Sequence, residues 1–476
     1  MKADLKQVLY YFNKISQIPR CSGDEQAISD YLLSVATKNG LQGLRDHANN
    51  VLIRKKASLG HETAKPVMLQ GHMDMVCVKS NQSIHDFSKD GITVLQNGDY
   101  LYADGTTLGA DNAIGMALSL AVLTDLNAVH PPLEALFTTR EETGMTGACQ
   151  LDVPYLQIKS KTLINLDTAW EGVFIASASG GVSIVLCLNA ERTQPKFPCF
   201  AHLMVGGLLG GHSGLNIGME RANAILVLAR VLFDLGETIE LADFSCISPD
   251  NAIPTAANAT LAYENVAVLE KKISELNSLL KKEYAQSDPG IQISLQTVLP
   301  TDTVLCRVDE KKLLSLLLLL PNGVICRDAE SGLVLTSCNL ACVQEENGSF
   351  TVRNSVRSSV QSQLYTLLIP RYTLLTELFK LQMVSEGAYP AWDFSEDSEI
   401  RTLAMKCYEK ESGKQGSIVK LHAALECGCL IQKLGTVDAI SMGPELNNCH
   451  TTEENLSLPS VEMTYNVLKE ILRNIK

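Results

Sequence analysis

The chain has 476 residues, of which 46% are hydrophobic and 20% charged, a composition typical of a folded globular protein and unlike a disordered or collagen-like one. Its length favours two folded units over one. With 53 acidic and 40 basic residues the formal charge is −13, which disfavours a nucleic-acid partner because phosphate groups would be repelled.

We expect neither export nor a membrane partner. Charges near the N-terminus interrupt the apolar region that a secretory signal needs. The longest apolar run, residues 316–320, is closed by Pro321 and falls short of the roughly 18 residues that a membrane span requires. The sequence therefore predicts a cytoplasmic protein.

The 14 cysteines are scattered without a CxxC pair, a pattern typical of small buried hydrophobic residues in a reducing compartment. Cys338 with Cys342, or Cys427 with Cys429, are close enough in sequence to bind a metal. We do not expect either pair to do so.

The first part of the chain alternates helix and strand signals. Apolar spacing predicts helices at residues 4–17, 25–38 and 111–126. Short apolar runs predict buried strands at residues 66–70, 133–139 and 162–166. This alternation favours an α/β fold with a mostly parallel sheet flanked by helices, in which ligands gather beyond the carboxyl ends of the strands.

The character of the sequence changes at residue 183, where alternating apolar stretches mix with amphipathic helices at residues 269–285 and 310–320. Strand and helix signals of the first kind resume after residue 386 and end in a helix at 460–475. We therefore predict that an α+β domain, residues 183–386, is inserted into a catalytic domain formed by residues 1–182 and 387–476.

The first expected strand delivers His72 and Asp74 at positions i and i+2, which places both side chains on one face of an extended segment. Metal-bound histidines usually donate their other ring nitrogen to a carboxylate or carbonyl, so the pair fits a ligand with an orienting carboxylate. Taken alone, the pair is better explained as two polar residues in a surface turn.

Asp111 begins a predicted helix and, taken alone, is better explained as its N-terminal cap. Gly105 and Gly109 build a tight loop in front of it. A carboxylate can bridge two cations because each of its oxygens offers lone pairs.

Glu141 and Glu142 follow the second buried strand and would repel each other unless a positive group lies nearby. One of them can bind a metal while the other takes a proton from metal-bound water. The alternative is a solvated charged turn, which is less natural directly after an apolar strand.

Asp167 follows the third strand, and His450 lies in a late polar loop. With His72, Asp111 and Glu142 they make two imidazoles and three carboxylates, a set that suits Zn²⁺, Mn²⁺ or Co²⁺. If two ions shared one aspartate as a bridging ligand, each ion would have one imidazole and one further carboxylate.

Seven motifs, in their order, resemble those of the metallopeptidase family of aminoacylases, glutamate carboxypeptidases and dipeptidases, and are most similar to those of its dipeptidases. The motifs are IPRCSG at 18–23, QGHMDMV at 70–76, GADN at 109–112, TREETG at 139–144, GGHSG at 210–214, NAIP at 251–254 and LECG at 425–428. The resemblance implies a catalytic domain of the di-zinc aminopeptidase type, with the inserted domain as a lid.

By that resemblance, His72 and Asp167 hold one metal ion, Glu142 and His450 hold the other, and Asp111 bridges the two. We expect the two divalent ions to be Zn²⁺, with Mn²⁺ or Co²⁺ as alternatives.

The resemblance also implies the chemistry. Asp74 would orient His72, and Glu141 would be the general base. A metal-bridging hydroxide would attack the peptide carbonyl, while Glu141 accepts the water proton and passes it to the leaving amine.

In the inserted domain, the family motif contributes His212, which would stabilise the oxyanion that develops on the carbonyl. Arg357 resembles the residue that grips the substrate's free carboxylate, a task that suits a guanidinium fork, although a plain surface arginine is the competing interpretation. Asn251 is a candidate hydrogen-bond partner of the substrate, and a turn beside Pro254 is its alternative role.

Two stretches depart from the family pattern. Residues 450–454 read HTTEE where the family more often has HSPDE, and residues 168–171 read TAWE in place of an acidic run. These changes leave open which dipeptides are preferred. His422 and Glu426 resemble additional ligands, but because the ligand set is complete we interpret them as structural or rim residues.

The sequence thus predicts a metal-dependent dipeptidase for unblocked dipeptides, of Xaa-His type or of broad specificity. An N-acyl amino acid deacylase of the same family is one alternative, and a non-catalytic metal-dependent binding protein is another. A two-metal phosphoesterase is disfavoured because no phosphate-binding glycine loop is present. Since related enzymes are often dimers, a homodimer is a further expectation.

Overall fold

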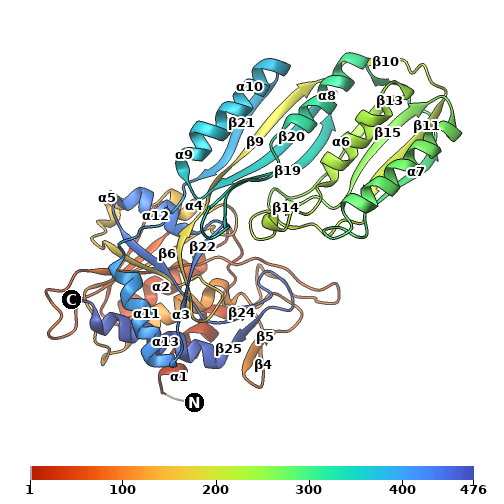
Figure 1. Ribbon diagram of the computed structural model, residues 1–476. Coiled ribbons are helices and arrows are strands. Elements are labelled where there is room, and N and C mark those ends of the chain that lie inside the picture. Colours follow the sequence, from red (N-terminus) through yellow and green to blue (C-terminus); the bar gives the residue numbers. More distant parts are fainter. Residues whose placement is uncertain (1–2) are drawn as a thin grey trace. The chain divides into compact units, whose positions relative to one another are not determined.

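The computed structural model describes residues 3–476 and divides the chain into two compact units (Figure 1). The first unit comprises Met1–Ala178 and Trp392–Lys476, and the second comprises Ser179–Ala391. The domain boundaries expected from the sequence, at 182/183 and 386/387, lie within a few residues of these divisions. Residues 1 and 2, part of the N-terminal segment in which no signal was expected, lie outside the described residues.

The first unit is built on an eight-stranded sheet in the order β1-β2-β6-β3-β7-β23-β8-β22. These strands are β1 (Gln42–Arg45), β2 (Val51–Lys55), β3 (Val67–His72), β6 (Leu133–Thr138), β7 (Thr162–Asn165), β8 (Val173–Ala178), β22 (Ser417–Leu421) and β23 (Asp438–Ser441). The central strands β6, β3, β7 and β23 run parallel, which confirms the mostly parallel sheet. Towards the edges, β1 and β2 join antiparallel, and β8 meets β23 antiparallel.

Helices cover both faces of this sheet. All six residues of β3 are buried, and because alternate residues of a strand face opposite sides, neither face is open to solvent. The helices of the unit are α1 (Ala3–Ser16), α2 (Gln26–Lys38), α3 (Ala110–Thr124), α4 (Thr146–Cys149), α5 (Val153–Leu156), α11 (Glu399–Ser412), α12 (Glu426–Leu434) and α13 (Leu458–Asn474). Helix α3 packs on β3, and α1 packs on both α3 and α13.

A small second sheet in the same unit has the order β24-β25-β5-β4. Its strands are β4 (Val94–Asn97), β5 (Tyr100–Ala103), β24 (Leu446–Asn447) and β25 (Asn455–Ser457). The loop between β24 and β25 carries His450, so this sheet brings a late segment of the chain beside an early one.

The second unit contains two antiparallel sheets, in the orders β18-β19-β20-β9-β21 and β13-β15-β11-β16. Their strands are β9 (Gly180–Asn189), β11 (Cys199–Gly206), β13 (Ile239–Ser245), β15 (Ala257–Tyr263), β16 (Gln292–Val298), β18 (Gly323–Arg327), β19 (Val334–Glu346), β20 (Ser349–Ser358) and β21 (Gln382–Tyr389). Short strand pairs join β10 (Arg192–Thr193) to β17 (Val304–Leu305) and β12 (Gly211–His212) to β14 (Ala252–Ile253).

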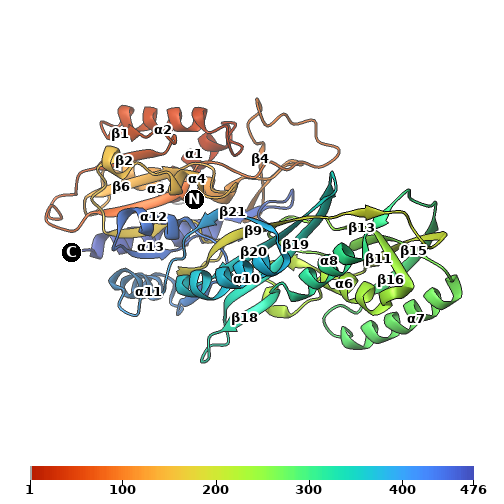
Figure 2. The same ribbon diagram turned by 90° about the horizontal axis from the view of Figure 1, so that it is seen from above.

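The helices of the second unit are η1 (Ile217–Met219), α6 (Ala224–Leu235), η2 (Gly236–Thr238), α7 (Val266–Glu283), α8 (Arg307–Leu319), α9 (Gln361–Gln363), η3 (Leu364–Leu368) and α10 (Ile369–Phe379). Helix α6 packs on β11 and β15, and α7 packs on β16 (Figure 2). Segregated helices and antiparallel sheets make this unit α+β, as its sequence pattern indicates.

The elements expected from apolar periodicity are present in both units, and their ends differ from the expected ones by at most three residues. Helix ends depend on local hydrogen bonds that periodicity does not report. Of the described helices, none is both long and apolar enough to cross a membrane.

In the first unit Cys21 lies beside Cys77 and Cys149 lies beside Cys429, with Cα–Cα distances of 5.7 and 5.2 Å, so four of the cysteines that are scattered in sequence form two close pairs. The partners lie 56 and 280 residues apart in sequence, so their spacing carried no sign of the pairing. Within the described part of the chain, no candidate metal-binding group includes a cysteine.

Candidate metal centre

The parallel strands of the first unit carry polar side chains to one edge of the sheet. Strand β3 ends on His72, Glu141 follows β6, and Asp167 follows β7. Because β6, β3 and β7 are parallel neighbours, their carboxyl ends meet at the same edge. Asp111, at the start of α3, and His450, from the loop after β24, complete the cluster.

Two trios of side chains converge within this cluster. His72 Nε2 lies 2.9 Å from Asp111 Oδ1 and 3.5 Å from Asp167 Oδ1. His450 Nε2 lies 3.3 Å from Asp111 Oδ2 and 3.0 Å from Glu142 Oε1. The two oxygens of Asp111 thus face different imidazoles, which is the arrangement that a bridging carboxylate requires.

The arrangement of the donor atoms suits bound cations better than hydrogen bonding among the side chains themselves. The ligand atoms of each trio lie within 4.8 Å of one another. A single ring nitrogen cannot satisfy two carboxylates, yet two converge on His72 Nε2. The buried Oε1 of Glu142 faces the same ring nitrogen of His450 that also faces Asp111. Nitrogen and oxygen donors in this number suit two ions of the zinc type.

Glu141 belongs to a further trio with His72 and Glu142. The distances alone therefore do not separate a ligand role of Glu141 from a role in proton transfer. The assignment of Glu141 as base and Glu142 as ligand stays a prediction.

The carboxylate of Asp74 organises the loop that carries the two glutamates. It accepts hydrogen bonds from the backbone N–H of Glu141 at 3.0 Å and of Glu142 at 3.2 Å, and from Ser22 Oγ at 2.7 Å. Its Oδ1 lies 3.4 Å from His72 Nδ1, while the backbone carbonyl of Asp74 lies closer, at 3.1 Å. Asp74 thus faces the ring nitrogen opposite the cluster and also holds the backbone of the glutamates.

Burial and charge shift the acid–base properties of the cluster in opposite directions. Burial raises the pKa of Asp167 to about 6 and that of Glu141 well above its usual value, although the charge of His72 opposes both increases. Burial would also raise the pKa of Asp74, but hydrogen bonds and charge from His72, with the bonds from Ser22 and Glu141, lower it to about 2. The cluster therefore holds more carboxylates than its imidazoles can neutralise, as expected of a site for cations.

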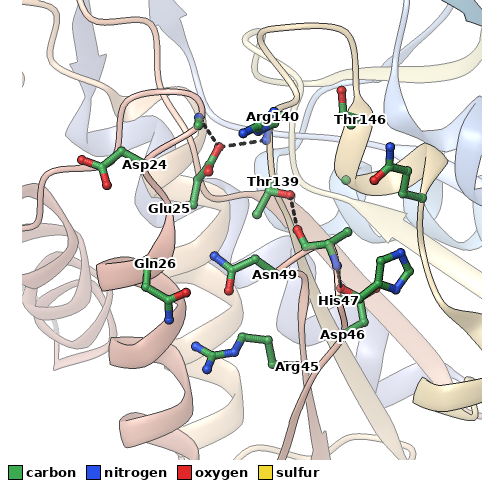
Figure 3. A pocket seen from close by; sticks show the side chains of 14 residues that line it. Asp24, Glu25, Gln26, Arg45, Asp46, His47, Asn49, Thr139, Arg140 and Thr146 are labelled. Atoms are coloured by element: carbon green, nitrogen blue, oxygen red, sulfur yellow. Dashed lines mark hydrogen bonds between the residues drawn. The ribbon is translucent and has the colours of Figure 1, made fainter.

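A second contact fixes the same glutamate loop from the other side. The carboxylate of Glu25 accepts the backbone N–H of Arg140 at 3.1 Å and that of Gly23 at 2.8 Å (Figure 3). Glu25 and Arg140 also line a polar pocket of about 610 Å³. Arg45, which also lines the pocket, forms an ion pair at 2.5 Å with Asp30, which lies outside the lining. The visible role of the pocket is to support the loop.

Arg20, which is 1% exposed, ties together the two segments that lead to His72 and Asp111. Its Nη1 donates to the carbonyls of Met73 at 3.0 Å and Asp74 at 2.9 Å, and its Nη2 donates to the carbonyl of Gly109. Gly109 has a φ of +65°, and a Cβ there would lie 2.7 Å from the arginine Nη2. The position therefore requires glycine.

Glu454 holds the loop that carries Asp111. Its Oε2 accepts the backbone N–H of Leu108 at 2.9 Å and of Gly109 at 3.0 Å, and its Oε1 accepts that of Ala110 at 2.9 Å and of Asp111 at 3.3 Å. Burial raises the pKa of Glu454 to about 7, against the effect of these amides. Sequence reasoning missed Glu454 as a functional residue, because its partners lie about 345 positions away.

We expect Glu454→Gln to destabilise the protein by about 1–3 kcal/mol, because its amide NH₂ group would face buried N–H donors that then lack an acceptor. Urea unfolding of the metal-free protein measures this loss. Glu453→Gln, the same change at the exposed neighbouring residue, is the control and should leave the midpoint unchanged. Equal midpoints for both variants would contradict the role given to Glu454.

Glu426 begins helix α12 and is fully buried, which rules out the rim position that the sequence left open for it. Its Oε2 accepts hydrogen bonds from Gln70 Nε2 and Thr138 Oγ1, both at 2.6 Å. Burial raises its pKa to about 7, with the charge of His72 acting in the opposite direction. Glu426 therefore sits inside the sheet–helix interface, close enough to the cluster to be affected by its charges.

The three expected substrate-site residues, His212, Asn251 and Arg357, lie in the second unit. His212 is in β12, where its Nδ1 accepts the backbone N–H of Gly214 and of Leu215, both at 3.1 Å. Because Nδ1 is an acceptor, the neutral ring carries its proton on Nε2, the nitrogen that could donate to an oxyanion. The backbone carbonyl of Asn251 accepts from the N–H of Ser213 at 2.7 Å, and the Asn251 residue is exposed.

Arg357 lies on β20 and is 9% exposed, which corrects the alternative interpretation as a plain surface arginine. Its Nη1 donates to Tyr389 Oη at 2.8 Å. Its buried Nε has no hydrogen-bond partner among the described residues. A buried guanidinium with an unpaired N–H group fits a residue that binds a ligand better than an arginine that is exposed to solvent.

Comparison with known sequences assigns the chain to a family. The family model described as peptidase family M20/M25/M40 matches residues 68–474, a range that contains all the residues of the cluster. The chain belongs to peptidase family M20/M25/M40. It is therefore a hydrolase of peptide bonds, and peptidases of this family use divalent metal ions.

Two relatives match over nearly their whole length. The cytosol non-specific dipeptidase of Escherichia coli (strain K12) is 36% identical over 473 residues, which cover 98% of this chain and 96% of that protein. The crystal structure of aminoacylhistidine dipeptidase from Vibrio alginolyticus is 33% identical, with a TM-score of 0.87 and coverage of 99% and 96%. Aminopeptidase PepT from Bacillus cereus, at 14% identity, a TM-score of 0.59 and coverage of 99% and 98%, shares the fold.

Proposed function

We propose that this M20 peptidase hydrolyses unblocked dipeptides. The main support is the near full-length similarity to two relatives that are named as dipeptidases. The motifs around the cluster support the same assignment, because they are more similar to those of dipeptidases than to those of deacylases. We propose broad specificity or a preference for Xaa-His dipeptides.

The proposed metal centre holds two divalent cations. His72 and Asp167 would hold one, Glu142 and His450 would hold the other, and Asp111 would be a ligand of both. Zn²⁺ fits this mixture of imidazoles and carboxylates, with Mn²⁺ and Co²⁺ as the alternatives. When bound, the cations polarise the substrate carbonyl and lower the pKa of a water molecule.

In the proposed mechanism, Glu141 moves the proton. Its carboxylate accepts a proton from the attacking water and delivers it to the nitrogen of the leaving amine. Asp74 positions Glu141 through the backbone N–H at 3.0 Å and fixes the ring of His72. No covalent acyl-enzyme is required.

The second unit is proposed to be a lid that completes the substrate site. His212, with its proton on Nε2, stabilises the negative charge that develops on the carbonyl oxygen of the substrate. Arg357 binds the free carboxylate of the substrate, and Asn251 forms a hydrogen bond with the substrate. His212→Asn should lower kcat by about 10²–10³-fold with the metal content unchanged, as measured by steady-state kinetics and metal analysis. A variant with normal kcat would remove His212 from the mechanism.

A substrate panel tests the proposed activity. Metal-free protein is reloaded with Zn²⁺, Mn²⁺ or Co²⁺ and given free dipeptides, N-blocked dipeptides and an N-acetyl amino acid. We expect cleavage of the free dipeptides only, lost on addition of a chelator and restored by metal.

Each other outcome selects a different function. Hydrolysis of the N-acetyl compound alone would identify a deacylase. Absence of turnover with every metal would support a non-catalytic metal-dependent binding protein. Cleavage of dipeptides that persists in chelator would contradict the metal centre.

Two further assignments accompany this function. We propose a cytoplasmic location, which is supported by the E. coli relative named as a cytosol dipeptidase. We also propose a homodimer, which sedimentation measurements can test against a monomer of 51.8 kDa.

A further inference from the structure

A line of buried polar side chains crosses four strands of the first unit. Gln70 Nε2 on β3 donates to Thr138 Oγ1 on β6 at 3.1 Å, and Gln70 Oε1 accepts from Asn165 Nδ2 on β7 at 2.6 Å. Ser441 Oγ on β23 donates in turn to Asn165 Oδ1. All four side chains are 0% exposed, so this line is a polar band inside an otherwise apolar layer.

The band lies next to the proposed metal ligands. Gln70 and Asn165 precede His72 and Asp167 by two residues, so on their strands they share the face of the sheet with these ligands. Thr138 is the cross-strand partner of His72. The band therefore supports the strand ends that carry the ligands.

Of the carboxylates that the structure describes, Glu426 is the one joined to the band. Its Oε2 accepts from both Gln70 and Thr138 at 2.6 Å. Its Oε1 is buried and has no hydrogen-bond partner among the described residues. Among the residues that the structure describes, no lysine or arginine forms an ion pair with Glu426.

An ionised carboxylate in this position needs positive charge nearby. The hydrogen bonds from Gln70 and Thr138 to Oε2 favour the ionised form, whereas burial opposes it and raises the pKa of Glu426 to about 7. A buried charge without a counter-charge is costly. His72, Asp167 and Asp74 are the charged side chains that act on Glu426 most strongly, and two of these three are negative. The protein itself therefore supplies too little positive charge, whereas two bound cations would supply it.

We propose that Glu426 is a positioning residue of the metal centre, whose negative charge strengthens cation binding while its hydrogen bonds hold the ends of β3 and β6 together. This inference rests on the metal centre of the proposed function. Glu426 binds neither cation itself. It acts on the ligands through Gln70, Thr138 and the electric field of its charge.

Glu426→Gln tests the charge separately from the hydrogen bonds. The amide oxygen can still accept from Gln70 and Thr138, and the NH₂ group replaces the Oε1 atom that has no partner. Ser441→Ala is the matched control, because it removes only neutral hydrogen bonds, to Asn165 and Thr168, at the end of the band opposite Glu426. Metal-free proteins are titrated with Zn²⁺ in competition with a chromophoric chelator.

We expect Zn²⁺ binding by Glu426→Gln to be weaker by about 10-fold or more, as for other residues that support metal ligands, and binding by Ser441→Ala to stay close to wild type. The visible spectrum of the Co²⁺-loaded variant should keep its band positions, because no ligand is lost. Equal Zn²⁺ affinities of wild type and Glu426→Gln would overturn the inference. Shifted Co²⁺ bands would also overturn it, since Glu426 would then be a ligand.

A second pair of variants covers the case in which Glu426→Gln does not fold. Glu426→Asp and Glu426→Asn create the same cavity and differ in charge, so the aspartate variant should bind Zn²⁺ about 10-fold more tightly. Equal affinities within this pair would again contradict the role of charge. If the wild-type protein itself binds no Zn²⁺, the proposed metal centre fails, whereas a failure confined to the Glu426 variants removes only this inference.

Discussion

Glu141→Gln should lower kcat for dipeptide hydrolysis by about 10²–10⁴-fold, the range typical of a lost general acid–base group. The glutamine keeps the size of the side chain but cannot accept the proton of the attacking water. The backbone should not move, because Asp74 holds residue 141 through its main-chain N–H. Steady-state kinetics on the preferred dipeptide, with metal content measured by mass spectrometry, provide the test.

Glu142→Gln is the matched control for this prediction. Its Oε1 lies 3.0 Å from His450 Nε2, so the same substitution one residue later should remove bound metal as well as activity. The two variants together decide which glutamate is the metal ligand and which is the base. The distances do not decide this, since both glutamates lie in a trio with His72. Loss of metal from Glu141→Gln, with metal retained by Glu142→Gln, would mean that the two roles are reversed.

Asp111→Asn should reduce the bound metal from two ions to one or fewer, and lower hydrolysis by at least about 100-fold. The two oxygens of Asp111 face His72 and His450, whereas an asparagine offers one oxygen and an NH₂ group that cannot bind a cation. The loss should exceed the roughly 10–100-fold that follows from removing a residue that only supports a ligand. Metal analysis after dialysis, together with kinetics, measures both effects.

Stability provides an independent readout of the same variant. Asp104→Asn, in an exposed position of the preceding loop, is the control and should keep two ions. Zn²⁺ should raise the Tm of the wild type and of this control more than that of Asp111→Asn, because a ligand that binds only the folded state stabilises it in proportion to its affinity. An Asp111→Asn protein that retains two tightly bound ions would exclude Asp111 as the bridge.

The positions of the strand-end residues were largely predictable from the sequence. The runs before His72, Glu141 and Asp167 are short, apolar and bounded by polar residues, and parallel strands bring such ends to one edge. The two oxygens of Asp111 face His72 and His450, as a bridging carboxylate would require.

Other parts of the site were not predictable, because their partners are distant in sequence. Glu454 holds amides about 345 residues away, and Glu426 binds Gln70 across 356 residues. A glutamate in a helix or loop looks the same in sequence whether it faces solvent or a row of buried N–H groups. The close approach of Cys149 and Cys429 was missed for the same reason.

The sequence by itself determined the fold class and the identity of the candidate ligands, because apolar periodicity and strand-end chemistry are local properties of the chain. Only the tertiary structure decided which oxygen of Asp111 faces which imidazole, that Asp74 and Glu25 hold the glutamate loop, and that Glu426 is buried under the ligands. These contacts depend on how β3, β6, β7 and α12 pack together. Packing sets burial and hydrogen-bond partners, and these in turn control the charge of each carboxylate.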